Sequence, residues 1–352
     1  MPTLELPPQI SGPSAWCGPD MARQTDWHHT LGADEIEEIK KAAQSAPDSG
    51  LDPIAMQREN FPLPRLAPRL RQILSEVLEG RGFVLLRGLP VGAWGPWKSA
   101  LAFLGLGLHF GHLRAQNAQG HLLGHVRDQG LSSKDPKVRI YQTRERQNYH
   151  TDSCDIVGLL CLQPARSGGL SSLVSSVTIF NEMRRRRPDL ARVLFDPIET
   201  DRRGEAGPGE RPYFRIPVFN WHAGLLSTIY QRAYIESARR FEGVSPLTSE
   251  QTAALDLFES LANDPALHFF MQFRAGDIQL VHNHTLLHDR TAFEDWPEPQ
   301  RRRHLLRLWL APTEARPLPA VFAERYGSVT PGKRGGIHAP GIALTVPWPV
   351  AV

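Results

Sequence analysis

The sequence contains few cysteines, and none of them belongs to a paired motif. Its 352 residues include three cysteines, Cys17, Cys154 and Cys161, and no CxxC pair. So small and odd a number excludes a disulfide scaffold, and it leaves no ligand set for a cysteine-built zinc or iron–sulfur site. Histidine is more frequent, with 14 residues. Any metal site is therefore expected to use histidine and carboxylate ligands.

Long apolar runs and a strong net charge are also missing. No apolar stretch approaches the roughly 18 residues that a membrane span needs, and the first residues do not resemble a secretion signal. The formal charge is +3, from 40 basic and 37 acidic residues. This excess is too weak to indicate a polyanionic partner. We therefore expect a cytoplasmic protein that has neither a membrane nor a nucleic acid as its partner.

Glycine is abundant, but its spacing matches no nucleotide-binding fingerprint. The glycine pairs Gly80/Gly82, Gly105/Gly107 and Gly168/Gly169 complete neither a dinucleotide motif nor a phosphate loop. The chain also shows no internal repeat and no alternation of strands with helices. Nucleotide-dependent chemistry is therefore not indicated.

The first part of the chain predicts an arm followed by helices. Residues 1–30 are rich in Pro, Gly and Trp without a period, and they predict an extended arm. Apolar stripes indicate amphipathic helices over 33–47 and 64–80, and a buried strand follows at 83–88. A helical insert is expected further on, over about 248–262.

Short β-rich runs, separated by Gly, Pro and Asp, dominate the chain after residue 138. This spacing is typical of a sandwich or a barrel. The runs are 138–143, 156–162, 170–177, 213–219, 225–230, 268–274, 277–282 and 304–310. The length of the chain leaves open one elaborated domain or two small ones.

An HxD pair lies close to the start of this β region, in the sequence Asn148-Tyr149-His150-Thr151-Asp152. In an extended chain, residues i and i+2 point to the same face. His150 and Asp152 can therefore offer an imidazole nitrogen and a carboxylate oxygen to one ion.

A third ligand is available near the other end of the region, where His282, His284 and His288 lie within seven residues. With His150 and Asp152, His288 makes a set of two neutral imidazoles and one carboxylate. This facial triad leaves three positions of an iron(II) ion open. We interpret His282 and His284 as strand or loop histidines outside the ligand set.

Two arginines follow on what is expected to be an inward face. Strand alternation places Arg303 and Arg307 on the same side as Leu305. A cation that points into a barrel needs a partner, and a planar guanidinium suits a carboxylate that it binds through two hydrogen bonds. Arg307 is the better-buried candidate, and its alternative partner is an internal Asp or Glu.

Together these motifs resemble the iron(II)- and 2-oxoglutarate-dependent dioxygenases of the taurine dioxygenase and gamma-butyrobetaine hydroxylase (TauD/TfdA-like) superfamily. The resemblance runs over most of the chain. It rests on the strand at 82–88, the His150–Asp152 element, the paired glycines before Ser171, the segment 288–293, and the arginines that follow it. It implies a mainly β fold with flanking helices, built on a double-stranded β-helix, or cupin-like jelly roll. Residues 31–352 would then form a single domain.

The resemblance also implies the chemistry. His150, Asp152 and His288 would be the catalytic ligands of Fe(II). With 2-oxoglutarate as co-substrate and O2 as oxidant, the enzyme would release succinate and CO2 and hydroxylate an unactivated C–H bond. Because Asp152 fills the position that related halogenases leave free for a halide, halogenation is not expected. Desaturation and other oxidative outcomes stay open.

For the co-substrate, the resemblance implies three contacts. Arg307 would grip the far carboxylate of 2-oxoglutarate, and Ser171 would donate a hydrogen bond to the same carboxylate. Arg303 would reach the metal-chelating end.

The substrate is expected to be a small polar or amphipathic organic molecule. Asn148, Tyr149 and Gln116 occupy positions where family members contact substrate, and each has a structural alternative as a loop or core residue. Arg139 and Arg215 could bind an anionic substrate, or they could be exposed arginines of strand faces.

Two other classes of function remain open at this point. One is a zinc-dependent hydrolase that uses His282, His284 and His288. The other is a non-catalytic jelly-roll binding protein, whose arginine clusters at 184–187 and 301–303 would bind nucleic acid. The residues do not decide whether the chain forms a homo-oligomer.

Overall fold

Two β-sheets stand at the centre of the computed structural model, which describes residues 5–48, 52–132, 138–207, 209–337 and 341–348. The larger sheet has seven strands. In pairing order they are β1 (His28–Thr30), β2 (Phe83–Arg87), β14 (Ile278–His282), β6 (Ile156–Gln163), β17 (His304–Ala311) and β3 (His112–Arg114), while β4 (Gly124–Val126) also pairs with β17. The smaller sheet has the order β13 (His268–Met271), β8 (Ser171–Ser175), β15 (Leu286–Arg290) and β5 (Gln147–His150).

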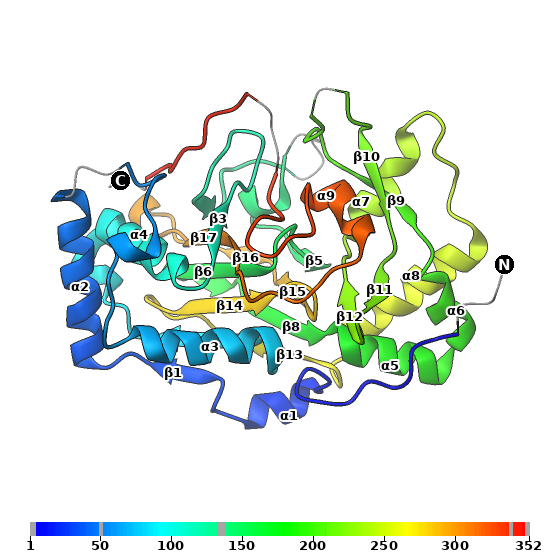
Figure 1. The fold of residues 1–352 in the computed structure, drawn as a ribbon, viewed down its shortest axis with the longest axis horizontal. Helices are drawn as coiled ribbons and strands as arrows, with labels where there is room; N and C mark the ends of the chain where they lie inside the picture. The colour runs from blue at the N-terminus through cyan, green and yellow to red at the C-terminus, as the bar shows by residue number, and fades with distance from the viewer. Residues whose placement is uncertain (1–4, 49–51, 133–137, 208, 338–340, 349–352) are drawn as a thin grey trace.

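Helices cover the two sheets from opposite ends of the molecule (Figure 1). One group, beside the larger sheet, consists of α2 (Ala33–Asp48), α3 (Ala67–Glu79) and α4 (Val91–Leu108). The other group packs on the smaller sheet and consists of α5 (Ser176–Arg186), α6 (Pro188–Val193) and α8 (Ser249–Ala262). The helices expected over 33–47, 64–80 and 248–262 are therefore present.

Strand alternation explains why the sequence of the larger sheet is apolar on both faces. In β2, Val84 and Leu86 pack against the first group of helices. Phe83 and Leu85 point the other way, into a cluster that also contains Leu173 of the smaller sheet. A strand buried on both faces reads as a continuous apolar run. This second cluster lies between the two sheets and makes them a sandwich.

Two short hairpins and a small helix extend from the sandwich on the side of the second helix group. The hairpins are β9 (Ile198–Asp201) with β10 (Tyr213–Ile216) and β11 (Phe219–His222) with β12 (Leu225–Thr228). The remaining elements are α7 (Arg232–Ser237), α9 (Ala323–Tyr326), α1 (Gly18–Arg23) and the pair β7 (Ser167–Gly168) with β16 (Phe293–Glu294). Short 3-10 turns, among them η2 (Ile140–Gln142), connect several of these segments.

The run at 138–143, predicted to be a strand, is instead the turn η2 with its flanks. Local hydrogen bonds explain the difference. The backbone N–H of Arg139 donates to the Gln142 side chain at 3.0 Å, and the hydroxyl of Thr143 donates to the carbonyl of Ile140 at 2.9 Å. Side chains that bond the nearby backbone in this way compete with strand pairing.

The expected arm at 1–30 also differs from a fully extended segment. It contains α1, whose Gly18 N–H donates to the carbonyl of Leu267, and β1, which pairs in parallel with β2. Trp16 is buried between these elements and the core. Tertiary contacts that the local sequence does not show therefore order this segment. The division into an arm and one domain over 31–352 stays a prediction.

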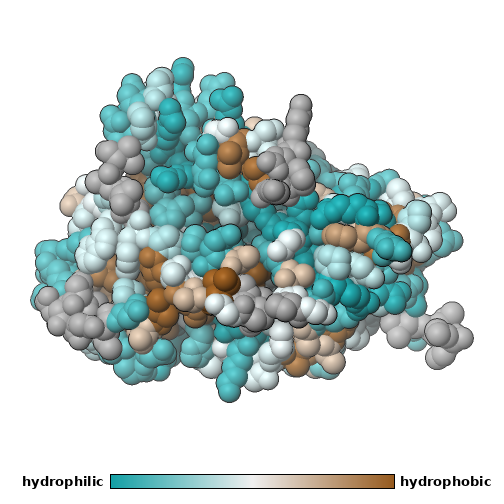
Figure 2. All heavy atoms as spheres, turned by 90° about the horizontal axis from the view of Figure 1, so that it is seen from above, coloured by the Kyte–Doolittle hydropathy of each residue, from teal (hydrophilic) through white to brown (hydrophobic). Residues whose placement is uncertain are grey.

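Hydrophilic side chains predominate on the face seen from above, where apolar patches are small (Figure 2). Within the described part of the chain, no helix combines the length and the apolar character that crossing a membrane requires.

A buried ion pair fastens the C-terminal segment to the start of β6. Arg334 is fully buried, and its Nη2 and Nε bond the carboxylate of Asp155 at 2.7 and 3.0 Å. The same guanidinium donates to the carbonyls of Val329 and Arg316, and His284 contacts Asp155 at 2.8 Å. Every charge in this group thus has a partner.

Replacing Arg334 with Met should lower the free energy of unfolding by about 3 to 5 kcal/mol, because Asp155 would remain buried without its main partner. Urea denaturation measures this loss. Arg192→Met is the matched control: Arg192 forms a surface pair with Asp196, and its loss should cost less than about 1 kcal/mol. Equal stability of the two variants would contradict this account.

Candidate metal centre and adjoining cavities

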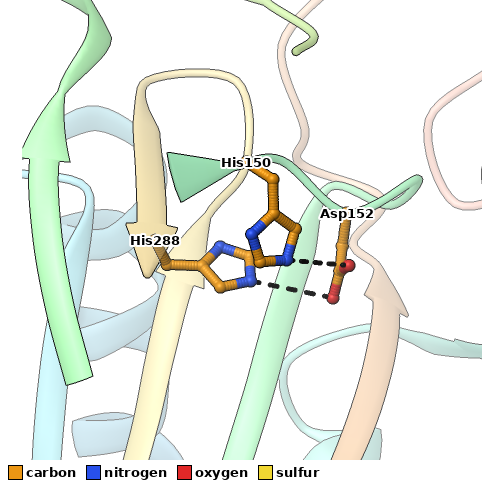
Figure 3. A group of neighbouring side chains, drawn as sticks. All are labelled: His150, Asp152 and His288. Carbon is orange, nitrogen blue, oxygen red and sulfur yellow. Dashed lines mark ion pairs between the residues drawn. The ribbon is translucent and has the colours of Figure 1, made fainter. Parts of the chain in front are cut away.

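Two neighbouring strands of the smaller sheet bring two histidines together. β5 and β15 pair antiparallel, with His150 directly opposite His288, and the centroids of the two rings are 4.1 Å apart. Asp152 follows β5 by two residues. Its Oδ1 lies 3.8 Å from Nε2 of His150, and its Oδ2 lies 4.0 Å from Nε2 of His288. Figure 3 shows both rings turned toward this carboxylate, and one ligand atom from each residue lies within 4.8 Å of the others.

The surroundings of the two histidines favour neutral rings. Nδ1 of His150 donates to the carbonyl of Asn148 at 2.9 Å, so that Nε2 keeps its lone pair. The amide nitrogen of Gln147 donates to that lone pair at 2.8 Å, and an ion bound at Nε2 would replace this hydrogen bond. Burial lowers the pKa of His150, and burial with the neighbouring imidazole lowers the pKa of His288 to about 3. Neutral imidazole is the form that binds metals.

The carboxylate of Asp152 is held in place by the larger sheet. Its Oδ2 accepts hydrogen bonds from Nε1 of Trp309 at 2.8 Å and from Nη1 of Arg307 at 3.2 Å, both from β17. Burial by itself would raise the pKa of Asp152, but Arg307 and the two histidines outweigh it, and the pKa lies below its ordinary value. These two hydrogen bonds thus hold the ionised carboxylate in an orientation toward the two imidazoles. Hydrogen bonds from surrounding residues commonly orient metal ligands in this way.

These three side chains fit an iron(II) ion. Two neutral imidazoles and one carboxylate are the donor set of the facial triad. Nδ1 of His288 has no hydrogen-bond partner among the described residues. The ring of His288 therefore lacks a hydrogen bond like the one from Nδ1 of His150 to the carbonyl of Asn148. The structure thus brings together the three ligands expected from the sequence.

Arg307 lies at the metal end. Its Nε donates to Oε1 of Gln116 at 2.7 Å, and its guanidinium carbon lies 4.9 Å from the ring centroid of Tyr141 and 5.0 Å from that of Trp309. The amide nitrogen of Gln116 donates in turn to the backbone carbonyls of Arg307 and Leu122. Gln116 therefore orients Arg307, and its polar atoms are already engaged.

A first cavity, the inner cavity, lies between the sheets beside the triad and contains about 470 Å³ of empty space. Ser171, Arg290 and Arg303 line it together with His288. Ser171 is the register partner of Arg290 across β8 and β15, and its hydroxyl donates to Gln279 at 3.2 Å.

The paired glycines let Arg303 reach the inner cavity. Gly169 has a φ of 65°, and a Cβ at this position would lie 3.0 Å from Nε of Arg303. A side chain here would therefore be strained and would crowd the arginine.

Two arginines of the inner cavity are short of partners. Nε and Nη1 of Arg290 and Nη1 of Arg303 are buried without a hydrogen-bond partner among the described residues. Burial and the charge of Arg303 lower the pKa of Arg290 to about 9, and burial lowers the pKa of Arg303 to about 10. Both guanidiniums lie over the ring of Phe293. Two buried cations with unused hydrogen-bond donors are costly in free energy, and a bound anion would compensate them.

Arg290 was not among the residues predicted for the site. It stands two residues after His288 on β15, so strand alternation places both on one face. The spacing of two residues from His288 was therefore the sequence feature that could have identified Arg290 as a site residue.

A second cavity, the outer cavity, contains about 810 Å³ of empty space and has His150 and Asp152 in its wall. The facing wall comes from the hairpins and α7, and includes Phe214, Ile229 and Tyr234. Tyr141, Gln147, His150 and Arg307 line both cavities. The triad therefore lies between them.

The expected substrate contacts Asn148 and Tyr149 do not line the inner or the outer cavity. Tyr149 is buried on the opposite face of β5, where its hydroxyl contacts Ser172 and its ring packs in the core near α5 and α8. Asn148 is exposed, and only its carbonyl reaches the site, through His150. Strand alternation, which aims His150 inward, aims its neighbour outward. Gln116 does line the outer cavity. Of the two arginines considered for an anionic substrate, Arg139 lines the outer cavity, whereas Arg215 is exposed and pairs with Glu199.

The alternative zinc cluster does not form. His282 contacts Thr285, and His284 contacts Asp155, so both are engaged away from His288. Across the described ranges, the only group of three or more His, Cys, Asp or Glu side chains placed to share a metal ion is that of His150, Asp152 and His288.

Comparison with known proteins gives relatives over most of the chain. Residues 43–309 match the family described as "Taurine catabolism dioxygenase TauD, TfdA family". FR-33289 synthase of Streptomyces rubellomurinus is 32% identical over 323 residues, which cover 90% of this chain and 95% of that protein. Taurine hydroxylase-like protein SAT17 of Stachybotrys chartarum is 30% identical over 315 residues, covering 87% and 80%.

Solved structures share the fold. An asparagine oxygenase in complex with Fe(II), hydroxyasparagine and succinate superposes with a TM-score of 0.62 at 18% identity, and the match covers 81% of this chain and 93% of that one. This likeness confirms the cupin-like jelly roll. The family match, which covers residues 43–309, also assigns the chain to a family. The chain belongs to the TauD, TfdA family, and it is a dioxygenase that uses iron(II), 2-oxoglutarate and O2.

Proposed function

We propose that this dioxygenase hydroxylates an unactivated C–H bond of a small organic molecule bound in the outer cavity. The observation that carries this proposal is the position of His150, Asp152 and His288 between two cavities. One cavity carries unpaired cations suited to a dicarboxylate, and the other is larger and has an apolar wall. We also propose that the protein acts in the cytoplasm, with neither a membrane nor a nucleic acid as partner, in keeping with its small net charge.

The protein's own contribution is to hold and orient. His150, Asp152 and His288 would bind the metal, and Trp309 and Arg307 keep the carboxylate of Asp152 aimed at it. Bound iron(II) with 2-oxoglutarate and O2 supplies the oxidising power, and the co-substrate leaves as succinate and CO2. Burial of His150 and Asp152 limits the access of water to this position.

We assign the far carboxylate of 2-oxoglutarate to Arg303 and Arg290, with Ser171 beside them. These two guanidiniums have unused donors, and they lie within the inner cavity. Arg307, in contrast, already uses Nε and Nη1 on Gln116 and Asp152, at the metal end. The sequence resemblance suggested the opposite arrangement, with Arg307 at the far carboxylate of 2-oxoglutarate and Arg303 at its metal-chelating end.

Succinate release tests the proposed function without knowledge of the substrate. Purified protein supplied with iron(II), ascorbate and 2-oxoglutarate should form succinate slowly, because uncoupled turnover needs no substrate. Asp152→Ala is the control and should form none. A protein that binds iron but neither binds 2-oxoglutarate nor forms succinate would refute the proposal.

Loss of a ligand should abolish stoichiometric iron binding. Asp152→Ala and His288→Ala each leave two donors, which is too few to retain the ion. The metal content after anaerobic loading and desalting measures this. His222→Ala, which removes an exposed histidine of β11, should bind one iron per chain. A His288→Ala protein that is folded by circular dichroism and keeps one iron would exclude His288 as a ligand.

Arg303→Gln should weaken 2-oxoglutarate binding about tenfold or more, since a charge-assisted hydrogen bond contributes about 1.5–3 kcal/mol. The comparison with 2-oxobutyrate, which lacks the far carboxylate, locates the effect. The wild type should prefer 2-oxoglutarate, and Arg303→Gln should lose that preference. Arg307→Gln should retain it. The opposite pattern would show that Arg307, and not Arg303, binds the far carboxylate of 2-oxoglutarate.

A further inference from the structure

A salt-bridge network of three residues forms part of the wall of the outer cavity. Nη2 of Arg139 donates to Oε1 of Glu205 at 2.5 Å, and Nη2 of Arg325 donates to Oε2 at 3.2 Å. One carboxylate thus bridges two guanidiniums. All three side chains are largely buried, with exposed fractions of 16%, 10% and 7% for Arg139, Glu205 and Arg325.

This network is anchored from several sides. Arg139 also donates to the hydroxyl of Tyr234 on α7 at 2.9 Å, and Nε of Arg325 donates to Ser153, next to Asp152, at 2.8 Å. The second contact ties Arg325 to Ser153, which directly follows Asp152 of the triad in the sequence. The network therefore has fixed positions relative to the triad.

The charges of the cavity wall do not balance. Its cations are Arg139, Arg307 and Arg325, and its anions are Asp152 and Glu205. Arg307 and Asp152 pair with each other at the metal end. The network is left with two cations and one anion. The hydrogen bonds of Arg325 to Ser153 and Glu205 use its Nε and Nη2, and its Nη1 is the donor that we assign to a ligand.

A further arginine, Arg202, stands near this network but does not line the cavity and has Glu210 as its own partner. Arg202 is buried, and its guanidinium carbon lies 5.6 Å from the ring centroid of Phe214, over which that of Arg325 lies at 5.4 Å. Burial lowers the pKa of Arg202, and the charge of Glu210, whose carboxylate lies 3.7 Å from Nη1 of Arg202, opposes that shift. A buried excess of positive charge is costly unless an anion compensates it.

Apolar side chains make up much of the facing wall. Phe214, Ile216, Val218, Ile229 and Ile235 line the cavity on this side. Carbon-rich parts of a ligand would gain from burial there.

We propose that the outer cavity recognises substrates that carry an oxyanion, such as a phosphate, sulfonate or carboxylate, through Arg139 and Arg325. The carbon skeleton of the substrate lies along the apolar wall, and the C–H bond that reacts points to the triad. Glu205 keeps the two arginines apart and oriented while no substrate is bound. This inference deepens the proposed function, because it rests on the outer cavity being the substrate site.

Binding of simple butyl compounds tests the inference. Calorimetry on the full chain, with saturating 2-oxoglutarate to fill the inner cavity, compares monobutyl phosphate, butane-1-sulfonate and pentanoate with neutral pentanamide. At least one anion should bind about tenfold more tightly than the amide, the effect expected of a charge-assisted contact. Arg139→Gln and Arg325→Gln should each remove most of that preference, whereas Arg325→Lys should retain part of it.

The Glu205→Gln variant gives a change of opposite sign. Loss of the bridging charge frees both guanidiniums, so the oxyanion should bind more tightly than to the wild type. Arg192→Gln, which removes a surface arginine that pairs with Asp196, should leave all affinities unchanged. Circular dichroism confirms that each variant is folded.

Two results would overturn the inference. One is an anion preference that survives in both arginine variants. The other is tighter binding of butylamine than of any anion, lost in Glu205→Gln, which would make Glu205 the recognition group for a cation. Because calorimetry measures binding and needs no turnover, failure of succinate formation in the dioxygenase assay would leave this test intact. Succinate formation with no anion preference would refute the inference alone.

Discussion

The buried negative charge of Asp152 is the constraint on which the site depends. A carboxylate withdrawn from water is costly by several kcal/mol unless donors surround it. Here Trp309 and Arg307 of the larger sheet supply them from one side, and His150 and His288 of the smaller sheet face it from the other. The centre can form only where the two sheets stand face to face. Packing of the two sheets against each other is therefore what surrounds the proposed metal ligand Asp152 with its partners.

The two cavities hold their cations in different ways, and the difference follows from what each must bind. Arg290 and Arg303 of the inner cavity stay short of partners. Such an arrangement lowers stability until a dianion arrives, as is common at functional sites. In the outer cavity, Glu205 already compensates part of the charge of Arg139 and Arg325. If 2-oxoglutarate binds in the inner cavity as proposed, its own charge compensates these arginines, whereas Glu205 already compensates part of the positive charge of the outer cavity.

The sequence allowed the grouping of His150, Asp152 and His288 to be predicted because the information for it is local or chemical. His150 and Asp152 follow the i, i+2 rule, and two imidazoles with a carboxylate define a known donor set. The same rule could have identified Arg290, two residues after His288, and could have turned Tyr149 away from the substrate. An internal Asp or Glu was an expected alternative partner of Arg307, but its identity as Asp152 could not be foreseen, since it depends on how far β17 is offset from β5 across the sandwich. No periodicity within one strand records that offset.

The three members of the outer salt-bridge network come from outside the two sheets. Arg139 precedes the turn η2, Glu205 lies between β9 and β10, and Arg325 belongs to the short helix α9. The metal ligands instead belong to, or directly follow, paired strands of the sandwich. On the proposed roles, substrate selectivity and oxidative reactivity are thus encoded in separate parts of the chain. Loops accept substitution and insertion more readily than strands, so a lineage could exchange the compound it oxidises while its oxidising centre stays the same.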